Sequence, residues 1–116
     1  MSVLVDLGGA DTYAYAERRS SLDTAETLVS DGAGRARNGA AVPSMSRTGR
    51  QGSGRLGVAL LYDLGAQGDR YRSLRMSQGF ASYGVGGLYD DGGNDEYAVE
   101  AGSQGAAVAG VAALVD

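Results

Sequence analysis

Aspartate recurs along this chain at positions where it could bind a metal ion. Each Gly-rich turn follows an aspartate and ends with a second aspartate two residues before a tyrosine, as in LYDDGGNDEY at 88–97. The first set contains Asp6, Asp63, Asp90 and Asp116, and the second contains Asp11, Asp69 and Asp95. Ca²⁺ takes about six to eight oxygen ligands from carboxylates and backbone carbonyls. The residues predicted to bind it are Asp6, Asp11, Asp63, Asp69, Asp90 and Asp95.

The same aspartates have a second interpretation, in which each one stabilises its own turn. Asp beside Gly commonly accepts hydrogen bonds from nearby backbone N–H groups. If the repeats stack, like charges lie about 5 Å apart, which costs around 0.8 kcal/mol per neighbour in water and several-fold more at a lower dielectric constant. Either a cation or hydrogen-bond donors must offset this repulsion, and the sequence alone leaves both interpretations open.

The aspartates belong to an internal repeat of about 26 residues. Three segments begin with Gln-Gly, carry Gly-Val six residues after the Gln, and end in Leu, one further residue and Asp. They are QGSGRLGVALLYD (51–63), QGFASYGVGGLYD (78–90) and QGAAVAGVAALVD (104–116). The Gln positions 51, 78 and 104 are 27 and then 26 residues apart. Three aligned copies with matching gaps indicate stacked structural units.

Strands suit this repeat better than helices. Apolar and polar residues alternate in DEYAVEA (95–101), and Gly is frequent in YGVGGLYDDGG (83–93), where each Gly in a helix would cost about 1 kcal/mol. We predict an all-β chain that forms a single-stack β-solenoid of about three coils of 26–27 residues. Its inward ladder would contain Leu4, Leu61, Leu88 and Leu114. The alternative is a strand-plus-helix repeat, because QGAAVAGVAALV (104–115) is also compatible with a helix.

The whole chain, 1–116, is predicted to be a single repeat domain with a long, partly helical insertion at 18–50. The first unit passes through LVDLGGADTY (4–13) but reaches its Gln-Gly pair only at Gln51. Within the insertion, DTAETLVSDG (23–32) predicts a short helix with an Asp N-cap, a capping-box Glu and a terminal Gly. The Arg-rich remainder predicts an exposed loop, which is either solvated or able to bind an anionic glycan or another chain.

One turn resembles a known calcium-binding pattern. DDGGNDEY (90–97) is similar to the turn of RTX-type calcium β-roll repeats, Gly-Gly-x-Gly-x-Asp-x-apolar-x, with Gly92, Gly93 and Asp95 matching and Tyr97 at the apolar position. The third Gly is absent, and the period is about 26 rather than about nine residues. The resemblance implies liganding oxygens and Ca²⁺ as the ion. The whole unit also resembles the Asp-Gly-Gly-Asn-Asp-x-Tyr and Gln-Gly repeats of uncharacterised bacterial β-solenoid (β-helix) proteins, which implies a fold but no activity.

Composition excludes several kinds of site and partner. The chain has no Cys and no His, which removes disulfides, thiolate metal sites and the usual proton shuttle. The repeats are acidic and the insertion has no aromatic residue, so a nucleic-acid partner is not expected. No apolar run approaches the roughly 18 residues of a membrane span, and no signal peptide is visible. An extracellular or cell-surface location is the expectation, because it fits a calcium-stabilised repeat.

Tyr and Gln recur in the same repeat. The recurring residues are Tyr13, Tyr71, Tyr97, Gln51, Gln78 and Gln104. They could bind the rings and hydroxyls of a glycan, but stacked rings and amide ladders between coils are the more common use of such columns.

These observations predict a non-catalytic module with a structural, adhesive or self-assembling role, with copies of itself or adjacent repeats pairing at open solenoid ends. No catalytic residue is predicted, because an acid that recurs in every unit is explained by the repeat itself. The alternative is a calcium-assisted carbohydrate-active β-helix enzyme, for which the non-repeated acids lie in the insertion.

Overall fold

The computed structural model describes residues 1–14, 49–99 and 102–116, and these residues contain strands but no helix. The strands are β1 (Ser2–Asp6), β2 (Thr12–Ala14), β3 (Gly54–Arg55), β4 (Val58–Asp63), β5 (Arg70–Arg72), β6 (Ala81–Ser82), β7 (Val85–Asp90), β8 (Glu96–Ala98), β9 (Ala107–Val108) and β10 (Val111–Val115). The described part therefore contains no helix that could cross a membrane. Residues 18–48 of the predicted insertion, and with them the short helix predicted at 23–32, lie outside the described residues.

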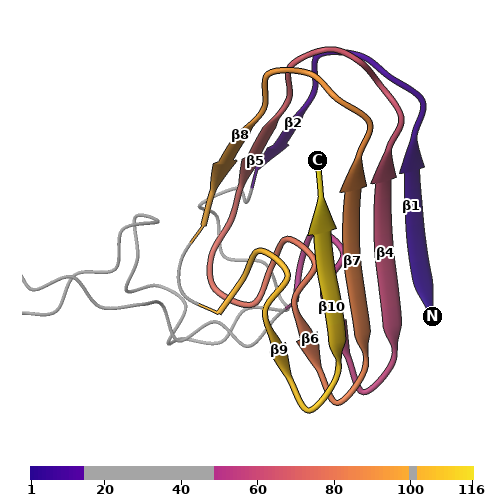
Figure 1. The fold of residues 1–116 in the computed structure, drawn as a ribbon, viewed down its shortest axis with the longest axis vertical. Coiled ribbons are helices and arrows are strands. Elements are labelled where there is room, and N and C mark those ends of the chain that lie inside the picture. Colours follow the sequence, from indigo (N-terminus) through magenta and orange to yellow (C-terminus); the bar gives the residue numbers. More distant parts are fainter. Residues whose placement is uncertain (15–48, 100–101) are drawn as a thin grey trace, which may run out of the picture.

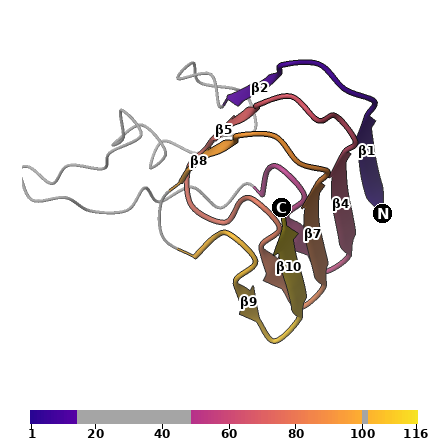
Figure 2. The ribbon, with the colours of Figure 1, turned by 45° about the horizontal axis from the view of Figure 1, so that its top comes forward.

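The strands form three parallel sheets, each built from every third strand along the chain. Their orders are β1-β4-β7-β10, β2-β5-β8 and β3-β6-β9, and Figures 1 and 2 show the members of the first two sheets side by side. Pairing joins equivalent positions of the repeat, so that Leu61 lies beside Leu88 and Tyr71 beside Tyr97. The prediction of an all-strand chain is confirmed for the described residues. The strand-plus-helix alternative is wrong there, since its candidate helix forms β9 and β10.

The core lies between the sheets and contains one inward residue from each of the central strands. Leu61 and Leu88 of the four-stranded sheet are 3% and 1% exposed, and they pack against Tyr71, which is fully buried. Full burial of such a side chain stabilises the fold by about 1.5–3 kcal/mol. The predicted leucine ladder is correct in register, but Leu4 is 48% exposed, because β1 lies at the edge of its sheet and pairs with only one strand among the described residues.

Each Gln-Gly pair makes a turn in which both residues have a positive φ, as at Gln78 (52°) and Gly79 (75°). A Cβ on Gly79 would collide with the carbonyl oxygen of Ala113, so glycine is required there for a close approach as well as for the turn. The Gln78 amide donates a hydrogen bond of 2.9 Å to the carbonyl of Tyr71. The Gln side chains thus bond to backbone carbonyls, where the sequence had suggested amide ladders.

The first unit closes in the same way, although a long segment separates its two parts. The Gln51 amide lies 2.6 Å from the carbonyl oxygen of Tyr13, which is the contact equivalent to that between Gln78 and Tyr71. Residues on either side of 15–48 therefore occupy the same positions as in the uninterrupted second unit.

Candidate metal centre

Three aspartates occupy equivalent positions at the ends of three neighbouring strands. Asp6, Asp63 and Asp90 are the last residues of β1, β4 and β7, and they pair with one another in register. They lie on the inner side of the sheet because each is two residues beyond an inward leucine. Asp63 is 0% and Asp90 2% exposed. At Asp6 and Asp63, one carboxylate oxygen accepts the N–H of the glycine two residues later, at 3.1 Å in both cases.

Tyrosines of the adjacent sheet contact these carboxylates through their hydroxyl groups. The Tyr13 hydroxyl lies 2.9 Å from an oxygen of Asp6 and 2.8 Å from one of Asp63, so it bridges two neighbouring units. The Tyr71 hydroxyl donates to the same oxygen of Asp63, at 3.1 Å, and the Tyr97 hydroxyl donates to Asp90 at 2.9 Å. The result is a chain of alternating carboxylates and phenols along the stack.

The tyrosine rings hold this chain in place. Tyr71 stacks against Tyr13 on one side and Tyr97 on the other, with centroid distances of 4.8 Å and interplanar angles of 4° and 5°. The 4.8 Å spacing equals the distance between neighbouring strands. The hydroxyl groups are therefore positioned by the strand register itself.

The second set of aspartates also links neighbouring units, but through the backbone. The N–H of Asp11 donates to Oδ1 of Asp69 at 2.6 Å, and the N–H of Asp69 donates to Oδ1 of Asp95 at 2.7 Å. Each carboxylate thus accepts its hydrogen bond from the equivalent residue of the preceding unit. Asp69 is 1% exposed.

The structure brings three of the six predicted ligands into one buried cluster. Asp63, Asp69 and Asp90 each offer a carboxylate oxygen, and these oxygens lie within 4.8 Å of one another. Oδ2 of Asp69, Oδ1 of Asp90 and Oδ2 of Asp95 are buried without a hydrogen-bond partner among the described residues. A buried oxygen of this kind loses its hydration with no replacement. Asp69 and Asp90, each with an unpartnered oxygen, could bind a metal ion together with Asp63.

Burial and mutual repulsion alter the acidity of the cluster. Burial raises the pKa of Asp69, and the charges of Asp63, Asp95 and Asp11 raise it further, against the lowering effect of the bond from the Asp11 N–H. Burial also raises the pKa of Asp90, although hydrogen bonds from Tyr71 and Tyr97 oppose the change. The folded protein therefore holds these two carboxylates in their charged form at a cost.

Asp6 and the tyrosines titrate differently. The N–H of Gly8 and, after it, the hydroxyl of Tyr13 lower the pKa of Asp6. Burial raises the pKa of the Tyr71 phenol well above its usual range, and the adjacent carboxylates of Asp90 and Asp63 add to this shift. The phenols of Tyr13, Tyr71 and Tyr97 therefore remain protonated and act as donors at neutral pH.

These shifts predict that chelated protein becomes more stable as the pH falls from 7 toward about 4. A carboxyl with a raised pKa contributes stability that is fully present below its unfolded pKa and is lost as the pH rises through its folded pKa; this applies to Asp69 and Asp90. Asp6 has the opposite sign, because the stability from its lowered pKa is lost as the pH falls through its folded value. Melting temperatures measured between pH 7 and about pH 4 show which of these opposite contributions to stability is larger.

The Asp69→Asn/Asp90→Asn double variant is the control for this pH dependence, since it lacks the two carboxyl groups of the described residues whose pKa is raised. Its melting temperature should be nearly constant where that of the wild type rises. A wild-type melting temperature that falls steadily over the same range would contradict the assignment.

The other three predicted ligands occupy less central positions. Asp6 and Asp11 are half-buried, and the Asp6 carboxylate already accepts from Gly8 and Tyr13. Asp95 is half-buried but has one unpartnered oxygen, and its charge acts on both Asp69 and Asp90. The sequence did not reveal that tyrosine hydroxyls bind the first set of aspartates. The only signal for this was the recurrence of Tyr seven or eight residues after each Asp, at 6/13, 63/71 and 90/97.

The fold and site together define an all-parallel β protein with a buried carboxylate cluster between two of its sheets. Comparison of the chain with protein families, curated proteins and solved structures found no match. The chemistry of the site is therefore inferred from its own residues.

Proposed function

We propose that this chain is a non-catalytic structural module whose three sheets are the faces of a single-stack β-solenoid, stabilised by Ca²⁺. Each unit of the repeat contributes one strand to each sheet, and the next unit adds its strands in register. Each repeat unit of about 26 residues then forms one coil of the solenoid. One observation carries this proposal. The recurring Tyr, Gln and Asp side chains make contacts that either close their own coil or join it to a neighbouring coil.

Three kinds of contact support a structural role for the recurring residues. The Tyr71 ring stacks on its equivalents in both neighbouring coils, the Gln78 amide closes its own coil, and Asp69 accepts the N–H of Asp11 from the preceding coil. An enzyme needs acids that a substrate can reach, whereas Asp63, Asp69 and Asp90 are at most 2% exposed. These positions favour a scaffold over the carbohydrate-active alternative.

Ca²⁺ is the ion that suits the carboxylate cluster best. It accepts an irregular shell of carboxylate and carbonyl oxygens, whereas Mg²⁺ requires near-octahedral geometry and usually retains several waters. Asp63, Asp69 and Asp90 would supply the charged ligands. Asp95 accepts the N–H of Asp69 through one oxygen, and its other oxygen is buried without a partner among the described residues. An ion at this position would offset the repulsion that stacking creates. Weak calcium affinity, in the range of about 10⁻⁴–10⁻³ M, is typical of extracellular modules, which is the setting we propose.

The four-stranded sheet also has edges at which the stack could continue. Strands β1 and β10 each pair with one neighbour among the described residues. An edge strand presents unpaired N–H and carbonyl groups to a further strand. Adjacent repeats or a second copy could therefore add coils in the same register, which is the self-assembly that we propose for this module.

Calorimetric titration of the chelated protein with Ca²⁺ tests the proposed site. We expect saturable binding with a stoichiometry near one, and much weaker binding of Mg²⁺ at the same concentration. Asp69→Asn should weaken Ca²⁺ binding at least tenfold, because it removes a charged ligand that is 1% exposed. Glu96→Gln is the matched control, since this acid is 69% exposed and pairs with Arg70 on the surface. Equal binding by wild type and Asp69→Asn would refute the site.

A further inference from the structure

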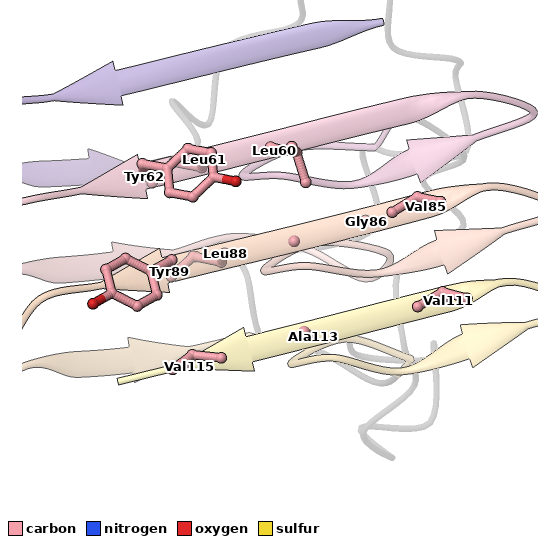
Figure 3. A pocket seen from close by; sticks show the side chains of 11 residues that line it. Leu60, Leu61, Tyr62, Val85, Gly86, Leu88, Tyr89, Val111, Ala113 and Val115 are labelled. Carbon is pink, nitrogen blue, oxygen red and sulfur yellow. The ribbon is translucent and has the colours of Figure 1, made fainter.

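The outer face of the sheet β1-β4-β7-β10 is apolar although it is exposed. Side chains alternate along each strand, so those between the inward leucines and aspartates point outward. The outward residues within the strands are Val3, Val5, Val58, Leu60, Tyr62, Val85, Gly87, Tyr89, Val111, Ala113 and Val115. None of them is charged, and exposure reaches 53% at Val5 and 66% at Val111. Figure 3 shows several of these side chains together on one side of the sheet.

The other two sheets do not share this property. Outward positions of β5 and β8 include Arg70, Arg72 and Glu96, with an Arg70–Glu96 ion pair of 3.4 Å, and those of β3 and β6 include Arg55 and Ser82. All-parallel sheets are usually covered on both faces and then have continuous apolar strands. The four-stranded sheet has such strands, so its composition fits a covered face.

The apolar face has both a ridge and a hollow. Tyr62 and Tyr89 stand side by side near the ends of their strands, with ring centroids 6.1 Å apart. Two residues before Tyr89, roughly 7 Å along the strand, Gly87 has no side chain. A hollow of about 260 Å³ lies over this part of the sheet, and its lining includes Leu60, Gly87 and Ala113.

We propose that a second copy of this chain covers the face, with the two sheets packed face to face about a two-fold axis. In this arrangement Tyr62 and Tyr89 of each copy enter the hollow at Gly87 of the other. An isologous interface needs one surface that carries both a projection and the matching recess, and this face has both at a spacing of two residues. An uncharged face also allows two acidic chains of net charge −4 to approach without burying a charge.

The area sets the strength of the expected dimer. Four strands about 4.8 Å apart and five residues long give roughly 300 Å² of flat face per copy. Exposed Leu56, Tyr83 and Leu64 lie in the turns that flank the strands. The strands of two copies would bury roughly 600 Å², which is below the about 1,200 Å² at the lower end of specific interfaces. A weak dimer, with a dissociation constant of about 10⁻⁵–10⁻³ M, is expected.

Sedimentation velocity of the full chain across a concentration series, from about 10 µM to about 1 mM, tests the proposal with and without chelator. The wild type should shift from monomer to dimer, independently of Ca²⁺. Tyr62→Lys/Tyr89→Lys should weaken dimerisation at least tenfold, because it places charges on the buried face. Ala66→Lys/Gln67→Lys changes the net charge equally at exposed turn positions and should dimerise as the wild type does.

A second variant keeps the proposal testable if the lysine variant fails to fold. Gly87→Val places an uncharged side chain in the hollow, and a Cβ at this position meets only the flexible end of Leu60. It should also weaken the dimer while circular dichroism shows an unchanged fold. A protein that stays monomeric to the highest concentration overturns the proposal. So does a dimer or larger assembly that persists unchanged in both face variants, which would indicate association through the strand edges alone.

Discussion

Replacing Asp90 by asparagine is expected to stabilise the chelated protein and to destabilise the protein in saturating Ca²⁺, each relative to wild type. Without the ion, the change removes a buried charge that lies close to Asp63 and Asp69. Two like charges 4 Å apart cost about 1 kcal/mol in water and more in a less polar surrounding. With the ion at one hundred times its dissociation constant, the wild type gains about 2.7 kcal/mol, most of which the variant loses. Thermal unfolding with and without Ca²⁺ measures both effects as changes in melting temperature relative to wild type.

The neighbouring residue, Asp91, provides the control for the opposite effects of Asp90→Asn on stability without and with Ca²⁺. Asp91 follows Asp90 directly, but it is exposed and lies outside the cluster, where one of its oxygens accepts a bond from Tyr89. Asp91→Asn should change the free energy of unfolding by no more than about 0.5 kcal/mol under either condition. If Asp90→Asn instead destabilises the protein equally with and without Ca²⁺, Asp90 serves only as a hydrogen-bond acceptor for Tyr97. That result would support the turn-acceptor interpretation of the aspartates.

The stacking of the chain could be predicted because the repeat carries its own register. A column such as Leu61 and Leu88, or Tyr71 and Tyr97, specifies which residues become neighbours once one strand is placed. A slip of one residue would turn every inward leucine outward, so the register is strongly determined. The neighbours of each recurring residue in the stack could therefore be predicted from the sequence.

The selection of three aspartates out of six could not be predicted in the same way. Asp63 and Asp90 lie on β4 and β7, which have a strand on each side, whereas Asp6 lies on the edge strand β1. Burial of an aspartate thus depends on its place in the stack, although its local sequence is nearly the same. The bond from the Tyr13 hydroxyl to Asp63 depends on how the intervening turn folds, which spacing alone does not give.

The outer apolar face had a signal in the sequence that the repeat pattern concealed. In VALLYD (58–63), no charged residue occurs before the final Asp, so both faces of the strand are apolar. A strand with one solvated face alternates between apolar and polar residues. The inward column is Leu in every unit. One outward column is Val at 58, 85 and 111, but the other outward columns vary among Val, Leu, Tyr, Gly and Ala.

Replacing Tyr71 by alanine should be among the most damaging substitutions in the described part of the chain. The side chain is fully buried, and its ring contacts Tyr13 and Tyr97 on opposite faces, each at 4.8 Å. Truncating a buried aromatic residue typically costs about 3–5 kcal/mol, and here it also removes a donor from Asp63. Since small domains are stable by only about 5–15 kcal/mol, the melting temperature should fall by more than 10 °C, which differential scanning calorimetry would detect.

Two further variants separate the ring of Tyr71 from its hydroxyl. Tyr71→Phe retains both stacked contacts and should cost only about 1–2 kcal/mol, from the donor lost to the buried carboxylates. Tyr83→Ala removes a ring that is 65% exposed and should cost at most about 0.5 kcal/mol. If Tyr71→Phe were as damaging as Tyr71→Ala, the phenol–carboxylate bonds and not the stacked rings would hold the coils together. In that case Ca²⁺ should stabilise the Phe variant and the wild type equally, because the Phe variant retains every carboxylate ligand. The difference in their free energies of unfolding should therefore remain.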